Sequence, residues 1–235
     1  MTDALLIIRN ELKRIANPKL RESGQRYFKG SVKMYGTKTA DVVKLAKDTF
    51  RTIKDKQKEE LFTLIESLWK SGYMEESFIA CEWTYSLRKQ FVKEDFEIFE
   101  QWIDLYVTNW ASCDTFCNHS VGALIEMYPT LFPRLRDWVR SNNMWLRRAS
   151  AVSLIVPARK GKFLTEIFAI AEIFLMDHED LVQKGYGWAL KVASQTHQNE
   201  VFAFVMSHKS TMPRTALRYA IEKMPKNLKE QAMKK

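Results

Sequence analysis

Trp110 and Asp114 are the two residues of this sequence whose types and spacing best suit chemistry. On a helix, residues four positions apart lie on the same face, so the indole and the carboxylate would be neighbours. A carboxylate stabilises developing positive charge and can orient or deprotonate a water molecule. The face of an indole ring attracts cations. Helix spacing alone also allows simpler roles, in which Trp110 fills a core and Asp114 caps a helix or forms a salt bridge.

Trp145-Leu146-Arg147-Arg148 is a second segment of interest, because a guanidinium can hold a phosphate with two hydrogen bonds. Adjacent residues on a helix point in different directions, so at most one of the two arginines would face a common site. The alternative is that both lie on a solvated face.

Residues 183–188, Gln-Lys-Gly-Tyr-Gly-Trp, form a third segment that brings a second indole, Trp188. Gly185 and Gly187 are unexpected there, because Gly costs about 1 kcal/mol relative to Ala inside a helix. Two glycines so close together indicate the near approach of a backbone or ligand, or tight packing between helices.

The elements that must position these residues are predicted to be helices. Gly and Pro are sparse, and apolar residues recur at helical spacing, as in Leu61, Leu64, Ile65 and Leu68. Similar stripes run through residues 96–106 and 163–174. Asn17–Pro18 and Thr39 are typical helix starts. We expect roughly a dozen short helices joined by short turns.

A weak internal repeat favours a solenoid over a globular bundle. Residues 142–149, 180–185 and 212–217 begin alike, and their alignment places Arg148, Lys184 and Arg214 in register, at spacings of 36 and 30 residues. A step of 34 residues back from Arg148 reaches Asp114. These periods match HEAT-type helix pairs, although chance similarity is an alternative. The prediction is an all-α superhelix in one domain, residues 1–235, with these polar side chains along one face.

The positive charge lies in the second part of the chain. Residues 1–133 hold 19 Lys and Arg against 19 Asp and Glu, whereas residues 134–235 hold 18 against 9, which gives the whole net charge of +9. A basic half beside a neutral half indicates a polyanionic partner, with nucleic acid first. Solubility alone is the simpler reading of the same charge.

The three cysteines, Cys81, Cys113 and Cys117, are too few for a disulfide framework. Residues 1–10 lack a basic start and a cleavage site, and no apolar run approaches the roughly 20 residues of a membrane span. We therefore expect a cytoplasmic protein. Cys113, Cys117 and His119 invite a metal interpretation, but His119 falls on another face of the helix, so no metal and no cofactor are expected.

These motifs together resemble the AlkD family of DNA alkylation repair proteins. Four separated segments agree in order and spacing across most of the chain. They are Trp110-x3-Asp114; Trp145-Leu146-x-Arg148-Ala149; Gln183-Lys184-x2-Gly187-Trp188; and Tyr27-Phe28-Lys29 followed by Tyr35-Gly36, where the family has Tyr-Met-Lys and a Gly. The resemblance implies HEAT-like repeats with a concave basic channel for duplex DNA, and hydrolysis of the N-glycosidic bond of cationic purines such as 3-methyladenine and 7-methylguanine.

The resemblance also implies roles for individual residues. Trp110, Asp114 and Trp188 would surround the deoxyribose of the lesion, and Arg148 would hold the DNA backbone. The expected partner is double-stranded DNA with alkylated bases, bound by a monomer. The DNA-binding set is completed by Tyr27, Lys29, Lys184 and Arg214.

Two departures from the family and two other classes of function remain to be weighed. Several members carry Trp and an acid on either side of the first Trp, where this chain has Asn109 and Ala111, which puts the substrate range in doubt. A non-catalytic DNA-binding module of the same family is the main alternative, and a HEAT-type protein scaffold is another. The remaining tryptophans predicted to fill core are Trp69, Trp83, Trp102 and Trp138.

Overall fold

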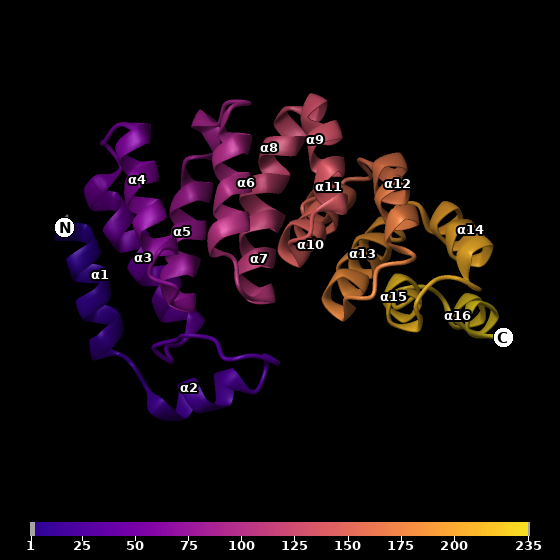
Figure 1. Ribbon diagram of the computed structural model, residues 1–235, viewed down its shortest axis with the longest axis horizontal. Coiled ribbons are helices and arrows are strands. Elements are labelled where there is room, and N and C mark those ends of the chain that lie inside the picture. Colours follow the sequence, from indigo (N-terminus) through magenta and orange to yellow (C-terminus); the bar gives the residue numbers. More distant parts are fainter. Residues whose placement is uncertain (1–2, 235) are drawn as a thin grey trace. The chain divides into compact units, whose positions relative to one another are not determined.

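The computed structural model describes residues 3–234, and every regular element within them is helical, without any strand (Figure 1). The predicted all-α class is therefore confirmed. The chain divides into two compact units, here called unit 1 (Met1–Phe116) and unit 2 (Cys117–Lys235). The prediction of a single domain and that of a concave basic channel stay predictions.

Unit 1 is a stack of helices that are arranged in the order in which they occur along the chain. Its elements are α1 (Asp3–Arg14), α2 (Pro18–Gln25), α3 (Thr39–Ile53), α4 (Lys58–Trp69), α5 (Met74–Ser86), the 3-10 turn η1 (Arg88–Gln90), α6 (Asp95–Tyr106) and α7 (Trp110–Phe116). α1 packs on α3, α3 on α5 and α5 on α7, while α4 packs on both α5 and α6. One row of helices thus lies against a second row, as in HEAT-like repeats.

Unit 2 repeats this scheme. It comprises η2 (Cys117–Val121, a π-helical turn), α8 (Gly122–Met127), η3 (Pro129–Leu131), α9 (Phe132–Asp137), η4 (Trp138–Arg140), α10 (Met144–Val152), α11 (Ile155–Ala158), α12 (Leu164–Phe174), α13 (Asp180–Ala193), α14 (Gln198–His208), α15 (Arg214–Ala220) and α16 (Lys226–Met233). α10 packs on α13 and α13 on α15, while α12 and α14 lie against α13 and α15. The stacked pairs confirm the HEAT-like prediction.

Helix starts follow the sequence signals closely. The side-chain oxygen of Asn17 accepts hydrogen bonds from the backbone N–H groups of Lys19 (2.9 Å) and Leu20 (3.2 Å), and Pro18 is the first helical residue. This is the geometry of an N-cap. Thr39 differs by one position, because it is the first residue of α3 and Lys38 precedes it as the cap.

The helical stripes and four of the tryptophans form the core, as predicted. Leu61, Leu64, Ile65 and Leu68 are all buried on α4. Trp69, Trp83, Trp102 and Trp138 are each at most 2% exposed. Burial of such large aromatic surfaces supplies much of the driving force for stacking. The remaining tryptophans, Trp110, Trp145 and Trp188, are half-buried, which separates the two expected site residues from the core set.

The helix starts also refine the internal repeat. α7, α10, α13 and α15 begin at residues 110, 144, 180 and 214, so their fifth residues are Asp114, Arg148, Lys184 and Arg218. The sequence alignment placed Arg214 in this register, whereas it is the first residue of α15, one helical turn earlier. The motif Met-Pro-Arg misled the alignment because the proline precedes the helix. The corrected spacing gives a more regular repeat.

None of the described helices has the length and apolar character needed to cross a lipid bilayer.

Candidate functional site

Helix α7 carries the first part of the candidate site, and Asn109 sets where it begins. The Asn109 side-chain oxygen accepts the N–H of Ser112 at 2.9 Å, and its backbone carbonyl accepts the N–H of Cys113 at 3.2 Å. Asn109 is only 5% exposed. The residue that departs from the family pattern is therefore a buried N-cap that fixes Trp110 as the first residue of the helix.

Trp110 is held by the segment that carries Tyr27 and Lys29. Its indole Nε1–H donates to the backbone carbonyl of Tyr27 at 3.3 Å. Its ring stacks on Phe28, with centroids 5.4 Å apart and planes at 26°. Two of the segments singled out in the sequence, 83 residues apart, are thus brought together.

Asp114 lies one helical turn after Trp110, half-buried, on the same face of α7. The helix beneath it is anchored to α5, because the hydroxyl groups of Ser77 and Ser112 lie 2.6 Å apart in the core. Thr115 donates back to the carbonyl of Ala111 at 2.8 Å. The carboxylate therefore stands on a helix whose start and buried face are both fixed.

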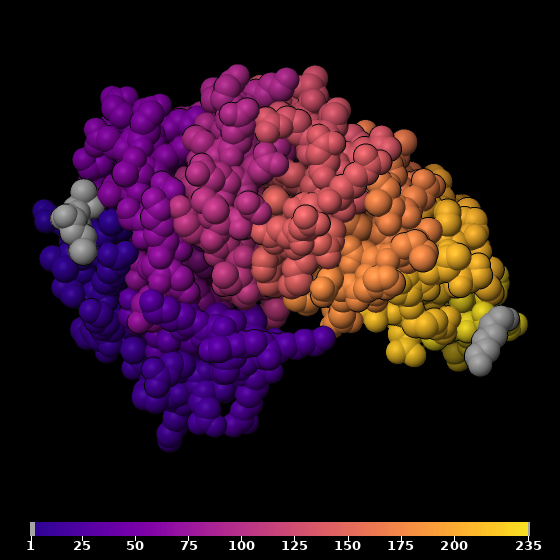
Figure 2. Space-filling model, viewed as in Figure 1, coloured from indigo at the N-terminus to yellow at the C-terminus, as the bar shows by residue number. Residues whose placement is uncertain are grey.

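The segment after α2 is the exposed edge of this part of the site. Tyr27 is 75% exposed, Lys29 is also exposed, and α2 buries none of its residues. In the space-filling view, α2 and the residues after it form the lower projecting part of unit 1 (Figure 2). An open groove beside α2 is lined by residues that include Arg21, Arg26 and Lys29. Glu22 also lines the groove and pairs with Arg26 at 2.9 Å, so the rim carries three cations and one carboxylate.

Glu75 anchors the other end of that segment. Its carboxylate accepts the backbone N–H groups of Tyr35 (3.0 Å), Gly36 (2.8 Å) and Thr37 (3.2 Å), and it is 2% exposed. Gly36 has φ +85°, and a Cβ there would meet the carbonyl of Asn17 at 2.5 Å. Only glycine fits that close approach, which accounts for its place in the motif.

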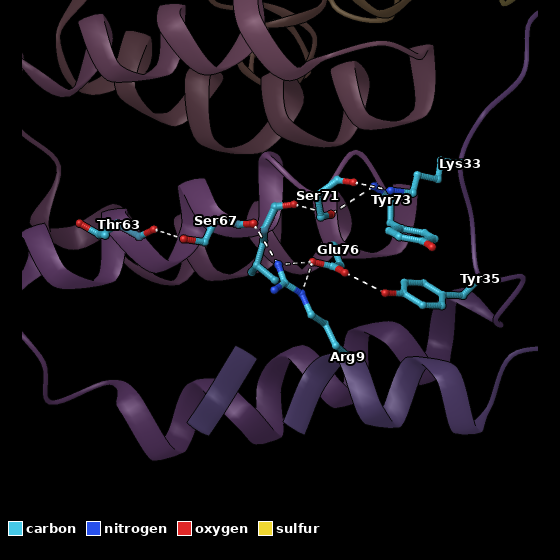
Figure 3. Close-up of polar contacts among 9 residues, drawn as sticks. Arg9, Lys33, Tyr35, Thr63, Ser67, Ser71, Tyr73 and Glu76 are labelled. Carbon is cyan, nitrogen blue, oxygen red and sulfur yellow. Dashed lines mark hydrogen bonds and ion pairs between the residues drawn. The ribbon is translucent and has the colours of Figure 1, made fainter. Parts of the chain in front are cut away.

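Glu76 forms a second anchor, drawn in Figure 3. Its carboxylate accepts the hydroxyl of Tyr35 at 2.9 Å and two hydrogen bonds from Arg9, each 3.1 Å long. Tyr35 also stacks on Tyr73 at 4.1 Å, and Lys33 lies over the Tyr73 ring. Burial, followed by the hydrogen bond to the Glu76 carboxylate, raises the pKa of Tyr35 well above its usual range. Tyr35 is therefore a protonated donor at any physiological pH.

Arg148, in unit 2, is a buried residue of α10. It is 5% exposed, and its Nη1 donates to the carbonyl of Leu181 in the first turn of α13. A Cβ at Gly185 would lie 3.4 Å from Cγ and 3.5 Å from Nη1 of Arg148. These are ordinary contact distances, so Gly185 packs against this arginine, but space alone does not require a glycine there.

Glycine is required at position 187 by the packing of α13 on α15. A Cβ there would lie 2.8 Å from both the carbonyl of Ala216 and the Cβ of Tyr219, so its absence lets α13 and α15 pack closely. Tight packing between helices therefore accounts for Gly187 but not for Gly185.

Arg147 points away from Arg148, as their adjacency predicts. Its Nε donates to the Asp177 carboxylate at 2.8 Å, and its Nη1 donates to the carbonyl of Ser141 at 2.9 Å. Arg147 thus joins the start of α10 to the turn before α13.

The remaining expected residues of unit 2 are more accessible. Lys184 pairs with Asp180 at 2.8 Å, and each side chain is 35% exposed. Trp188 is half-buried one turn after Lys184 on the same face of α13. Arg214 is exposed, and its Nη2 lies 3.2 Å from the sulfur of Met233. The exposed Arg218 was missed in the sequence, although counting residues from the helix starts would have found it.

The cysteines lie in the core. Cys81, Cys113 and Cys117 are buried and none of them is in a disulfide, and burial raises the pKa of Cys81. His119 is exposed. Across residues 3–234, no group of three or more His, Cys, Asp or Glu side chains is placed to hold a metal ion.

The rows of paired helices define a HEAT-like helical repeat protein. Helix α7 carries half-buried Trp and Asp side chains, and three later helices carry a cation at the position equivalent to the Asp. The profile of the DNA alkylation repair enzyme family matches residues 8–224. The chain belongs to that family.

One solved structure supports the fold. The chain is similar to a protein described as a predicted DNA alkylation repair enzyme from Enterococcus faecalis, with a TM-score of 0.81 and 19% sequence identity, over 90% of this chain and 97% of that one. At that identity the likeness establishes the architecture alone. No curated protein matches the chain.

Proposed function

We propose that this chain is a DNA glycosylase that hydrolyses the N-glycosidic bond of positively charged alkylated purines, such as 3-methyladenine and 7-methylguanine, in duplex DNA. The observation that carries the proposal is the pairing on α7: Trp110, tied by its N–H to Tyr27, stands one turn from the half-buried carboxylate of Asp114. Membership of the DNA alkylation repair enzyme family supports the same reaction class.

The chemistry needs few groups. An alkylated purine already carries positive charge, so when the bond between C1′ and the base nitrogen breaks, the electron pair leaves with the base and neutralises it. The sugar is left as an oxocarbenium ion. Asp114 stabilises that cation and takes a proton from the water that attacks C1′. The indole faces of Trp110 and Trp188 add cation–π attraction.

We assign DNA binding to the cationic and exposed residues that the sequence singled out. These are Tyr27 and Lys29 in unit 1 and Arg148, Lys184 and Arg214 in unit 2. Lys29 and Arg214 are exposed, as phosphate contacts require, and Lys184 is partly so. Arg148 is buried and its Nη1 donates to Leu181, so only the small exposed part of its side chain is left for the proposed contact.

The test is incubation of the protein with duplex DNA that contains 7-methylguanine, followed by chromatographic measurement of free base. We expect release from the alkylated duplex and none from the same undamaged sequence. The absence of release from the alkylated duplex, by a protein that melts cooperatively, would contradict the proposal.

A non-catalytic DNA-binding module is the second candidate, and the charge of unit 2 favours it. Residues 117–235 contain 18 Lys and Arg against 10 Asp and Glu, enough to bind a duplex without any chemistry. Tight, salt-dependent DNA binding with no base release would support this candidate instead.

A further inference from the structure

We propose that Phe28 is a positioning residue that fixes the orientation of the Trp110 indole for the reaction. The expected effect of Phe28 on reaction rate rests on the proposed function. The orientation of the indole by Phe28 rests only on contacts within unit 1. Phe28 makes no assigned contact with DNA. It acts through Trp110.

Two contacts from one segment constrain Trp110 in different ways. The hydrogen bond from Nε1 to the carbonyl of Tyr27 fixes the edge of the ring, because an indole has a single N–H to donate. The stack on Phe28, at 5.4 Å and 26°, covers one face. Together they set both the direction and the tilt of the ring. A substrate is left to meet the face that Phe28 does not cover.

The segment can act as a fixed support because Gln25 ties its two sides together. The Gln25 side chain donates to the carbonyl of Gly30 at 2.7 Å and accepts the N–H of Val32 at 3.1 Å. The backbone N–H of Phe28 donates to the Gln25 carbonyl at 3.1 Å. The turn that presents Phe28 is thus closed by three hydrogen bonds to one residue.

The buried carboxylate of Glu75 holds the following residues through three backbone N–H groups. Glu75 lies on α5, the helix to which α7 is bonded through Ser77 and Ser112. The support and the residue that it positions are therefore anchored to the same helix. The segments that carry the two partners of the Phe28–Trp110 stack are thus both held in place by hydrogen bonds to α5.

Loss of the Phe28 ring should loosen the indole without removing it. Half-buried side chains exchange rotamers rapidly unless a neighbour restrains them. A reacting group that is misplaced by a fraction of its size loses rate far more than it loses binding. Phe28→Ala should therefore act on the chemical step.

The structural part is tested with protein labelled with 5-fluorotryptophan. The chain has seven Trp residues, and the Trp110 resonance is the one that disappears in Trp110→Phe. In the DNA-free protein, Phe28→Ala should shift that resonance toward the position of a freely rotating, solvent-exposed indole, while Phe28→Tyr, which keeps the ring, should leave it at its wild-type position. Phe28→Leu, which keeps volume but no aromatic face, should behave like Phe28→Ala and serves if the alanine variant does not fold.

Phe168→Ala is a matched control. Phe168 is also half-buried, and it stacks on Phe204 with centroids 4.6 Å apart in unit 2. Phe168→Ala removes an aromatic stack comparable to that of Phe28 on Trp110. The substitution should therefore lower the melting temperature but leave the Trp110 resonance unchanged. An effect of Phe168→Ala on that resonance equal to that of Phe28→Ala would overturn the proposal.

The kinetic part uses single-turnover release of 7-methylguanine at saturating DNA. Phe28→Ala should slow release on the order of tenfold to a hundredfold, as misplacement of a reacting group does. DNA affinity should stay within about twofold, because phosphate contacts dominate it. Phe28→Tyr should restore the rate.

An unmoved Trp110 resonance in Phe28→Ala, or a rate lost equally in Phe28→Tyr, would refute the positioning role. If the wild-type protein releases no base, the proposed function fails, and the fluorine signal still decides whether Phe28 positions Trp110.

Discussion

Unit 1 and unit 2 share an architecture but differ in which charges they bury. Unit 1 holds 19 Lys and Arg against 18 Asp and Glu, and its buried ions are carboxylates, those of Glu75, Glu76 and Asp95. Unit 2 holds 18 against 10, and its buried ion is the guanidinium of Arg148. Each buried charge has a partner: Asp95, for example, accepts Lys58 at 2.6 Å and the N–H of Val92 at 2.9 Å.

The difference between the units shows that buried charges and net charge act separately: buried charges hold the structure together, and the net charge determines which partners are attracted. Buried ions must be paired or hydrogen-bonded, so they fix backbone segments in place. The excess of positive charge in unit 2 then falls on side chains that are accessible to a polyanion. We propose that unit 1 supplies the carboxylate for the chemistry and unit 2 supplies most of the attraction for DNA. Five predictions test the comparison of the two units, from the largest effect to the smallest.

The largest effect separates core from site within unit 2. Trp138→Ala should lower the free energy of unfolding by about 3–5 kcal/mol, because a fully buried indole leaves a cavity. Trp188→Ala should cost less stability, because Trp188 is half-buried, but should slow base release. Urea denaturation alongside release of 7-methylguanine measures both. Equal loss of stability in the two variants would place Trp188 with the core.

Asp114→Asn should break the chemistry of unit 1 and leave the binding of unit 2 intact. The amide keeps the shape of the side chain but removes the negative charge that faces the oxocarbenium ion. Loss of one such aimed group commonly costs about 10²–10³ in rate. Single-turnover release and DNA titration provide the two readouts. Undiminished release by Asp114→Asn would refute the proposed mechanism whatever the affinity.

Two tyrosines, the half-buried Tyr35 in unit 1 and the buried Tyr186 in unit 2, give a smaller contrast. Tyr35→Phe should cost about 1–3 kcal/mol, because Oε1 of the buried Glu76 carboxylate loses the Tyr35 hydroxyl while the Arg9 hydrogen bonds to Oε2 remain. Tyr186→Phe should be nearly neutral, because the Tyr186 hydroxyl is buried without a hydrogen-bond partner among residues 3–234. Urea denaturation at neutral pH checks the pair, and an equal loss in both variants would contradict the assigned role of Glu76.

The same tyrosines set a pH dependence. Burial raises the pKa of both in the folded protein, with the Glu76 hydrogen bond second for Tyr35 and the charge of Asp177 second for Tyr186. The contribution of each is complete below the unfolded pKa of about 10, and it is lost as pH rises beyond that value because only the unfolded chain releases the proton. Each Phe variant should therefore lose less stability than the wild type as pH is raised past that point.

The smallest effect concerns the salt dependence of DNA binding. Arg218→Ala in unit 2 should reduce the slope of log affinity against log salt by about one, the loss of a single phosphate contact. Lys56→Ala in unit 1 is the control, because Lys56 is an exposed cation paired with Glu60 at 3.0 Å on the neutral unit. Equal slopes for both variants would show that the basic unit has no special part in binding.

The sequence predicted much of the fold because its signals were local. Apolar spacing located α4, α6 and α12, and Asn17–Pro18 located α2. Phe163 marks the limit: it continues the stripe of α12 in sequence, but it lies just before the helix with φ 62°. The helical spacing of apolar residues does not reveal at which residue the helix begins.

The candidate site was predicted in its residue types but not in its contacts. The stack of Phe28 on Trp110 and the three N–H groups on Glu75 join residues far apart in the chain, and no spacing rule relates them. Gly187 was noticed as unusual, but its reason is the close approach of Ala216 and Tyr219 on another helix. Long-range packing explains these residues, and a single sequence carries no record of it.

The anchor of the segment that follows α2 has a consequence for how the sequence of that segment can vary. Glu75 holds that segment through the main-chain N–H groups of Tyr35, Gly36 and Thr37, and Gln25 holds it through the main chain of Gly30 and Val32. Apart from Gly36, whose φ excludes other residues, neither grip depends on the side chains that it restrains. A change of side chain in this segment, Gly36 excepted, therefore leaves its main-chain attachment in place, whereas loss of Phe28 or Tyr35 removes the contacts that those side chains make with Trp110 and Glu76.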